Sequence, residues 1–344
     1  MRDKSIDSFK GILTIFMVYC HCLQFFVNFE RSRTFYYISE YINLTTFSGF
    51  MFAFGYAAHL AYLSKPFSKA GNSILKNAGK TLVAFYVSSL AFRIFIDKVP
   101  YNPRVIYDIL LFRHMAGWSE FLASFTVIML VLLAFFFLFK KVNGLFVALT
   151  FVFSIVMCIV PYMDTSIIVG LVIGDKNGPS FPVLQYLIYF VIGIYFAKGR
   201  FEFKWLHLGI AALSSLIFIV YLINKKQLPS RFPPSAPWIL GAMLFLYGYY
   251  LLSRTISKNK YMDWLSDIGK NSLYYLLASN ILIFAMKSSG FYRMSPAFAS
   301  ILFIIIMIIL VYLKHLIRFS PKEKEVKTMN DTLDALELSK KAAV

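Results

Sequence analysis

Apolar runs of about 17 to 25 residues follow one another along nearly the whole chain, and each is long enough to cross the core of a bilayer. Lipid offers exposed backbone groups no hydrogen-bond partner, so we expect these runs to cross as helices. The runs place spans at residues 9–28, 43–63, 78–96, 119–140, 144–161, 181–198, 205–223, 236–253, 270–287 and 296–316. The sequence therefore predicts an all-α integral membrane protein, a polytopic bundle of about ten transmembrane helices.

The composition supports the membrane class and leaves little of the chain outside it. Of the 344 residues, 59% are hydrophobic and only 15% are charged, which is too apolar for a soluble domain. We expect one transmembrane domain over residues 1–319 and a charged cytoplasmic tail over 320–344, either a short amphipathic surface helix or a solvated chain end. Residues 165–182 hold too short an apolar stretch to cross, so we expect an outer loop or a re-entrant segment there. The proline-rich residues 228–237 have the composition of an outer connector.

The distribution of charge predicts the topology. The formal net charge is +18, but the positive residues are dispersed along connecting loops, which argues against nucleic-acid binding. With the N-terminus in the cytoplasm, about two thirds of the 35 Lys and Arg residues fall on the inner side, as the positive-inside rule requires. We therefore expect a multi-pass protein of the cell membrane with both termini cytoplasmic and its basic loops against membrane lipid.

The three cysteines, Cys20, Cys22 and Cys158, all fall inside predicted spans, so no disulfide framework is indicated. Cys20 and Cys22 flank His21, an arrangement that raises the question of a metal site. Consecutive positions on a helix diverge by about 100°, so these three side chains do not converge on one ion without other ligands. We expect no metal and interpret the cysteines as small buried residues.

Polar residues share one face of the first span. Lys10 and His21 are eleven positions apart, which at about 100° per residue gives them nearly the same direction, roughly 16 Å apart along the axis. Asp7, Thr14 and Gln24 lie within about 60° of that direction. In a membrane helix such a stripe must face protein or a water-filled cavity.

His21 falls near the middle of this span, where burial favours the neutral imidazole that a general base requires. The alternative is a histidine that only forms a hydrogen bond between helices. Lys10 falls near the inner interface, where it can keep its charge and either attract phosphate or pair with Asp7, three residues before it.

Five segments resemble, in order, motifs of the acyltransferase 3 family, the membrane-bound O-acyltransferases of bacterial surface polysaccharides. The first, IDSFKGILTIFMVYCHC, places Lys10 and His21 at the family's spacing of a basic residue, ten residues and a histidine. The others are FMFAFGYA at 50–57, GWSEFL at 117–122, YFVIGIYFAK at 189–198 and IGKNSLYYLL at 268–277. The resemblance runs collinearly from residue 5 to about residue 280, nearly the whole predicted membrane domain.

The chain departs from the family's pattern after the second span. Gly55 and Tyr56 match the second motif, whereas Phe54 stands where serine is usual. An Arg-x-x-Arg arrangement of the family corresponds to KNAGK, in which Lys80 fits the second position and Asn77 occupies the first. Lysine lacks the bidentate fork of arginine, so we expect donor recognition to differ in detail.

Three further positions concern the expected acceptor side. The family's late histidine corresponds to Ser279, beside Asn280, which removes one candidate acid or acceptor contact while the base is retained. Trp118 matches the family's mid-chain tryptophan, and its ring suits stacking on the apolar face of a sugar. Glu120 falls near the outer end of the fourth span, where it either binds sugar hydroxyls or pairs with a nearby basic residue.

The resemblance implies transfer of an acyl group, usually acetyl, from cytosolic acyl-CoA to a hydroxyl of a cell-surface or lipid-linked polysaccharide. It implies His21 as the general base, with a separate acyl-His intermediate as an open alternative. We assign acyl-CoA binding to Lys10, Lys76 and Lys80, whose charges suit the phosphates of CoA, although topology alone also accounts for such lysines. Acceptor-binding or supporting roles are assigned to Asp7, Tyr56, Trp118, Glu120 and Asn280.

Acyl-CoA is then a co-substrate, and we expect no cofactor. Two other classes of function stay open: a transporter or flippase for a glycan or anion, and a non-catalytic membrane scaffold with a degenerate acyltransferase fold. The transporter predicts broken helices and repeat symmetry, neither of which is evident in the sequence. The scaffold takes support from Phe54, Asn77 and Ser279. The acceptor sugar, the acyl length and the oligomeric state are left open.

Overall fold

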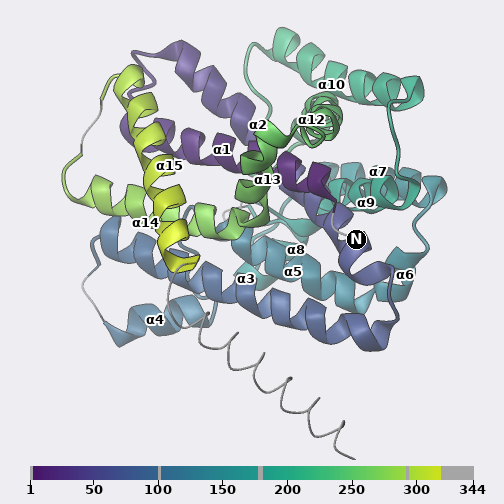
Figure 1. The fold of residues 1–344 in the computed structure, drawn as a ribbon, viewed down its shortest axis with the longest axis horizontal. Coiled ribbons are helices and arrows are strands. Elements are labelled where there is room, and N and C mark those ends of the chain that lie inside the picture. The colour runs from purple at the N-terminus through teal and green to yellow at the C-terminus, as the bar shows by residue number, and fades with distance from the viewer. Residues whose placement is uncertain (1–2, 100–101, 177–180, 292–293, 319–344) are drawn as a thin grey trace, which may run out of the picture.

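The computed structural model describes residues 3–99, 102–176, 181–291 and 294–318, and every regular element within these ranges is a helix (Figure 1). In chain order the helices are α1 (Lys4–Phe26), α2 (Arg33–Ala58), the π-helix η1 (His59–Leu63), α3 (Phe67–Phe95), α4 (Pro103–Leu110), α5 (Glu120–Ala134), α6 (Phe136–Lys140), α7 (Gly144–Ile159), α8 (Ile167–Ile173), α9 (Val183–Gly199), α10 (Trp205–Lys225), α11 (Ala236–Gly241), α12 (Met243–Ile256), the 3-10 helix η2 (Lys260–Met262), α13 (Asp263–Lys270), α14 (Ser272–Ser288) and α15 (Pro296–Arg318).

Each of the ten predicted spans falls on a helix or on two consecutive helices, such as α5 and α6 or α11 and α12. Within the described residues, five helical segments are long and apolar enough to cross a membrane: α1, α3, α10, the α11–α12 pair and α15. Helices α5, α7 and α9 are apolar but shorter. The all-helical class and the presence of several membrane-spanning helices are therefore confirmed, while the count of ten and the side on which the termini lie stay predictions.

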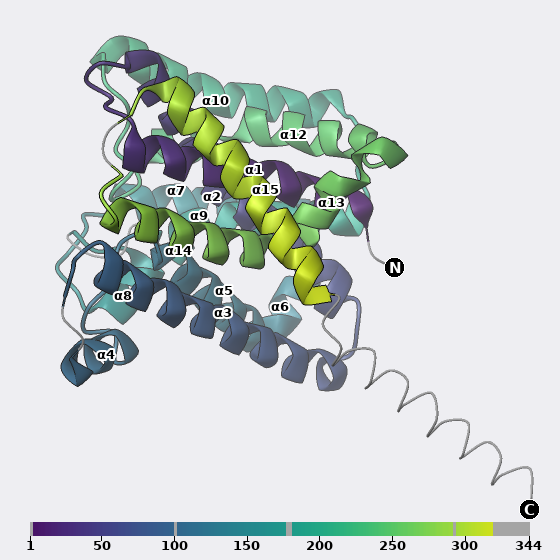
Figure 2. The same ribbon diagram turned by 60° about the vertical axis from the view of Figure 1, so that its left-hand side comes forward.

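Helix α1 runs through the middle of the bundle and packs against α2, α12, α13, α14 and α15 (Figures 1 and 2). It begins after Asp3, whose carboxylate accepts a hydrogen bond from the backbone N–H of Ser5 at 2.8 Å and so caps the helix. The Thr14 hydroxyl is fully buried and donates to the Lys10 carbonyl within the same helix. Because helices surround α1, its polar stripe faces protein rather than lipid.

The outer helices expose apolar surface instead. Leu149 of α7, Leu213 of α10, and Ile304 and Ile308 of α15 each leave more than half of their surface uncovered. In Figure 2, α15 crosses α1 and α14 obliquely, while most of the other long helices run alongside one another. Apolar surface exposed on this scale suits contact with lipid tails, because lipid tails are as apolar as leucine and isoleucine side chains.

Two helix pairs approach so closely that only glycine fits between them. A Cβ added at Gly269 of α13 would lie 1.8 Å from the Asp7 carbonyl oxygen of α1, and Gly11 of α1 faces α13 in the same contact. Gly55 of α2 and Gly193 of α9 form a second contact, where added Cβ atoms would lie 1.9 and 2.0 Å from backbone oxygens of the facing helix. The glycines of four sequence motifs are therefore packing residues, because small side chains let helices approach in a membrane.

The segment at residues 165–182 contains the seven-residue helix α8, which packs against α5 and α9. Its length agrees with the prediction that this stretch is too short to cross. The predicted tail at 320–344 lies outside the described residues.

Candidate active site

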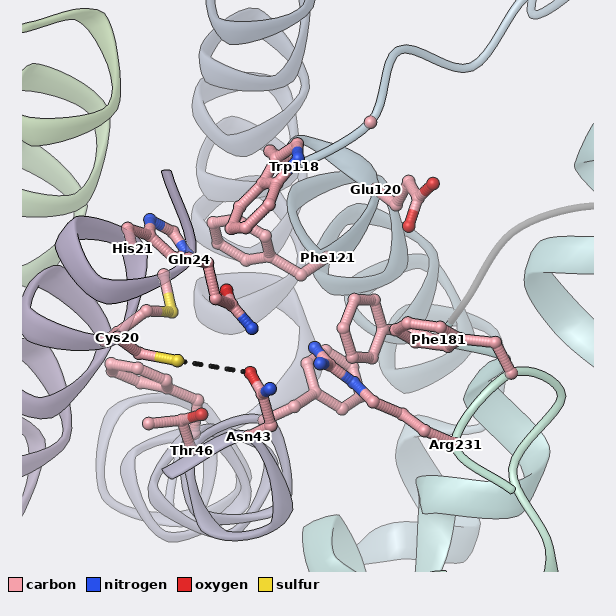
Figure 3. Close-up of a pocket in the computed structure, with 15 residues that line it drawn as sticks. Cys20, His21, Gln24, Asn43, Thr46, Trp118, Glu120, Phe121, Phe181 and Arg231 are labelled. Atoms are coloured by element: carbon pink, nitrogen blue, oxygen red, sulfur yellow. Dashed lines mark hydrogen bonds between the residues drawn. The ribbon is translucent and has the colours of Figure 1, made fainter. Parts of the chain in front are cut away.

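A cavity of about 310 Å³ opens beside the C-terminal half of α1 (Figure 3). Its wall is formed by α1, α2, the start of α5, the residues just before α5 and the loops that precede α9 and α11. Aromatic rings make up much of the wall, and its charged and amide side chains are His21, Gln24, Asn43, Glu120 and Arg231. The cavity therefore combines apolar surface with a few converging polar groups, which is typical of small-molecule sites.

His21 is held in one orientation by α14. Its side chain is 8% exposed, and its Nδ1 lies 2.7 Å from Oδ1 of Asn280, which is itself buried. The Asn280 amide nitrogen donates to the carbonyl of Trp118 at 3.4 Å, so the amide oxygen is the atom that faces the imidazole. An amide oxygen only accepts, so Nδ1 carries the proton and Nε2 keeps its lone pair. His21 thus presents a ring nitrogen with a free lone pair in the wall of the cavity.

Trp118 adopts a strained backbone to complete this arrangement. Its φ of 67° is in the left-handed region, which costs a bulky residue about 1–3 kcal/mol. Its ring meets the His21 ring edge to face at 4.9 Å and the Phe25 ring at 4.5 Å. Strain of this kind persists where surrounding contacts hold it, and it concentrates at functional sites. The strained backbone of Trp118 and its contact with the His21 ring give the segment GWSEFL, which resembles a family motif, a structural role beside the cavity.

Asn280→Ala is expected to lower the turnover of this site about tenfold or more while leaving KM for the donor nearly unchanged, because a buried N–H of His21 loses its acceptor and its fixed tautomer. The neighbouring Ser279→Ala is the matched control, since the Ser279 hydroxyl donates to the Leu276 carbonyl of its own helix, at 3.1 Å. Steady-state kinetics of both variants measure the effect. Unchanged turnover in Asn280→Ala would show that this hydrogen bond does not position the imidazole.

A second group of predicted residues lies at the other end of α1. Lys10 Nζ is 2.9 Å from Asp7 Oδ1, so the lysine forms the ion pair predicted as one of its two roles. The Tyr56 hydroxyl donates to the Asp3 carboxylate at 2.7 Å. Burial raises the pKa of Asp3, but hydrogen bonds from Ser5 and Tyr56 outweigh it, and the net pKa is below its usual value. None of these residues lines the cavity at His21.

The remaining predicted residues are divided between the cavity and the surface. Glu120 is in the cavity wall, and its carboxylate points away from His21 (Figure 3). Lys76 and Lys80 are exposed on α3 and do not line the cavity, while the Asn77 amide donates to the Tyr62 hydroxyl at 2.5 Å. The structure thus brings His21, Trp118, Glu120 and Asn280 together and leaves the three lysines of the donor prediction apart from them.

The sequence did not single out the other polar side chains of the wall as site residues. In the sequence, Gln24 lies on the polar stripe of the first span, Asn43 belongs to no motif, and Arg231 lies in a proline-rich connector. One signal could have marked Arg231: the connector that contains it is predicted to lie on the outer side, where the positive-inside rule makes arginine uncommon. The Cys20 thiol also reaches Asn43, at 3.4 Å from its amide oxygen (Figure 3).

Comparison with known proteins decides the family. A family model described as an acyltransferase domain matches residues 3–315. The chain belongs to the acyltransferase 3 family. The match includes α1 with Lys10 and His21 and extends to the last described helix, so the cavity is built wholly from acyltransferase 3 sequence. No curated protein and no solved structure matches the chain significantly.

Membership supports acyltransferase activity in general, and together with the long apolar helices it establishes a membrane protein. The resemblance stated from the motifs is thereby confirmed. The donor, the acceptor, the acyl group and the role of each side chain stay predictions.

Proposed function

We propose that the protein is a membrane O-acyltransferase that moves an acyl group, acetyl in the first instance, from acyl-CoA to a hydroxyl of a cell-surface or lipid-linked polysaccharide. The observation that carries the proposal is the buried imidazole of His21, fixed through Nδ1 by Asn280 at 2.7 Å beside a cavity of about 310 Å³. Such an imidazole suits a base that meets its substrate in an enclosed space.

In the proposed reaction, Nε2 of His21 takes the proton of the acceptor hydroxyl as the hydroxyl oxygen attacks the thioester carbon. The C–S bond then breaks, the CoA sulfur leaves as thiolate, and the proton passes from the imidazolium to that sulfur. The alternative is a double displacement, in which Nε2 itself attacks the thioester and an acyl-His forms before the acceptor is acylated. Mixtures without acceptor that are denatured at neutral pH and desalted at once distinguish the two, because only the second leaves labelled acyl groups on the protein.

The wall of the cavity suits a sugar on the acceptor side. The rings of Trp118 and Phe121 offer faces on which the apolar side of a sugar can stack, while the amides of Gln24 and Asn43 can exchange hydrogen bonds with hydroxyl groups. If the protein lies in a bacterial cell membrane with both termini in the cytoplasm, the cavity lies toward the outer half of the bilayer. Lys10 then lies toward the cytoplasm, where acyl-CoA is found.

Lys10→Gln, made together with Asp7→Asn so that no buried charge is left unpaired, is expected to raise KM for acetyl-CoA about tenfold and to change turnover less. The reason is that Lys10 is assigned to a phosphate of the donor. Lys258→Gln, which removes the same charge from an exposed position, is the control. An unchanged KM for acetyl-CoA in the double variant would contradict donor binding by Lys10 and would indicate that its role is the ion pair with Asp7.

The deciding experiment uses the purified full chain in proteoliposomes with radiolabelled acetyl-CoA and cell-envelope glycan. Label on the glycan through an alkali-labile ester supports the O-acyltransferase. Movement of glycan across the bilayer without acylation would support the transporter instead. Absence of both in a preparation that still binds acetyl-CoA would contradict the proposal and favour the scaffold.

A further inference from the structure

Arg231 enters the cavity from the loop between α10 and α11, and its guanidinium points toward the side where Asn43 lies (Figure 3). Two aromatic rings hold it. The guanidinium carbon is 4.4 Å from the Phe232 ring centroid and 5.7 Å from that of Phe181. Both rings belong to the same wall, so the cation is fixed by aromatic faces on loops rather than by an ion pair.

The guanidinium has donors to spare. Within the described residues, it donates no hydrogen bond and forms no ion pair, and its Nε is buried without a partner. Burial lowers the pKa of Arg231, and the charge of Glu40 is the largest influence in the opposite direction. A guanidinium keeps its charge in proteins and carries five N–H donors, so leaving those donors unpaired in an enclosed site is costly. An anion in the cavity would satisfy them.

The planar fork of arginine matches two oxygens of a carboxylate or a phosphate, and such paired contacts are among the strongest hydrogen bonds in proteins. The same wall offers Trp118 and Phe121 for stacking and the amides of Gln24 and Asn43 for hydroxyl groups. A volume of about 310 Å³ is at the lower end of ligand sites, which restricts the occupant to a small unit. Charge, apolar rings and size together describe one acidic sugar residue.

We propose that the cavity binds an anionic sugar unit of the acceptor, with Arg231 on its carboxylate or phosphate group and His21 beside the hydroxyl to be acylated. The role of this sugar unit as the acyl acceptor rests on the proposed acyltransferase function, whereas the binding of an anionic sugar in the cavity does not. The consequence is substrate selection by charge: a glycan with acidic units is taken up, and a neutral glycan of the same size leaves the guanidinium unpaired and binds weakly.

The test is ligand-observed saturation-transfer NMR on the purified full chain, with three probes of similar size: glucuronate, glucose 6-phosphate and glucose. The wild type is compared with Arg231→Gln, which removes the charge, and Arg231→Lys, which keeps a charge without the fork. Lys225→Gln is the control for net charge, because Lys225 is exposed at the end of α10 next to the same loop. Melting curves establish that each variant is folded.

We expect the wild type to bind at least one anionic sugar more tightly than glucose, and Arg231→Gln to weaken that binding about tenfold or more. Arg231→Lys should fall between the two, and Lys225→Gln should match the wild type. Preference for glucuronate identifies a sugar acid, and preference for glucose 6-phosphate identifies a phosphorylated unit; either supports the proposal. If Arg231→Gln does not fold, the wild-type preference and Arg231→Lys decide the question.

Three outcomes would overturn the proposal. The first is equal binding of glucose and both anionic sugars, and the second is unchanged glucuronate binding in both Arg231 variants. The third is an Arg231→Gln variant whose affinity for acetyl-CoA falls as much as its affinity for glucuronate. The last would assign the arginine to the donor. Failure of the proposed function is distinguishable, because Arg231-dependent binding in a chain that transfers no acyl group leaves the sugar site intact. Conversely, transfer to glycans without preference for charge would leave the acyltransferase intact and remove this inference.

Discussion

His21→Gln is expected to reduce acyl transfer by about 10²- to 10⁴-fold, the usual contribution of a general base. Glutamine is close to histidine in length and can still donate to Asn280, but it has no nitrogen that takes a proton at neutral pH. Because Nδ1 is used by Asn280, Nε2 is the atom left for the cavity, and the substitution removes that atom's chemistry while keeping the side chain's volume. The initial rate of labelled acetyl transfer in proteoliposomes, normalised to the amount of folded protein, measures the effect.

His315→Gln is the matched control for that experiment. His315 is an exposed histidine of α15 that does not line the cavity, so the same change should leave the rate at the wild-type value. The assignment of the base would be wrong if both variants transferred acetyl at the wild-type rate, or if both lost it to the same extent.

Gly269→Ala is expected to destabilise the bundle by about 1–3 kcal/mol or more, the cost of forcing extra volume into a packed contact. The added Cβ would lie 1.8 Å from the Asp7 carbonyl oxygen, and that oxygen belongs to the backbone of α1 and cannot rotate away. Helix α13 must therefore separate from α1, close to the ion pair of Asp7 and Lys10. The midpoint temperature of thermal unfolding should be clearly lower than that of the wild type. It is measured by size-exclusion chromatography of samples heated to a series of temperatures.

Gly209→Ala provides the comparison for the same chemical change. Gly209 is inside α10, and nothing lies within 4 Å of the position that its Cβ would take. Alanine is the better helix former by about 1 kcal/mol, so this variant should be at least as stable as the wild type. A Gly269→Ala protein as stable as Gly209→Ala would mean that the α1–α13 contact is looser than described.

Much of the fold could be predicted from the sequence because membrane helices follow from local properties. Apolar length alone located a helix, or two consecutive helices, at each of the ten predicted spans. The spacing of Lys10 and Asp7 by three residues predicted an ion pair as one of two roles for Lys10, and the structure contains that pair. Helix α13 was missed as a separate element, since its eight residues are amphipathic rather than continuously apolar. In the structure it packs against α1 through the close contact of Gly269 and Gly11 and a hydrogen bond between the hydroxyls of Ser8 and Ser266.

The site was only partly predictable because it depends on contacts between distant segments. His21 stands out in the sequence as an ionisable residue inside a span, but its partner Asn280 is 259 positions away. The sequence predicts an acceptor-binding or supporting role for Asn280 and gives no sign of its hydrogen bond to His21. The sequence does not predict a role for Arg231, because a loop has no periodicity that would indicate where its side chains point. Prolines and phenylalanines around it looked like connector sequence, whereas Phe181 and Phe232 in fact hold its guanidinium.

The most direct test of the role of His21 is imidazole rescue of His21→Ala in the acetyl-transfer assay. Alanine removes the base and enlarges a cavity that already measures about 310 Å³, so free imidazole has room to take the place of the missing side chain. We predict that added imidazole raises the rate of His21→Ala in a saturable manner and leaves the wild type and His315→Ala unchanged. Transfer by His21→Ala at the wild-type rate without imidazole, or equal stimulation of all three proteins, would contradict the account.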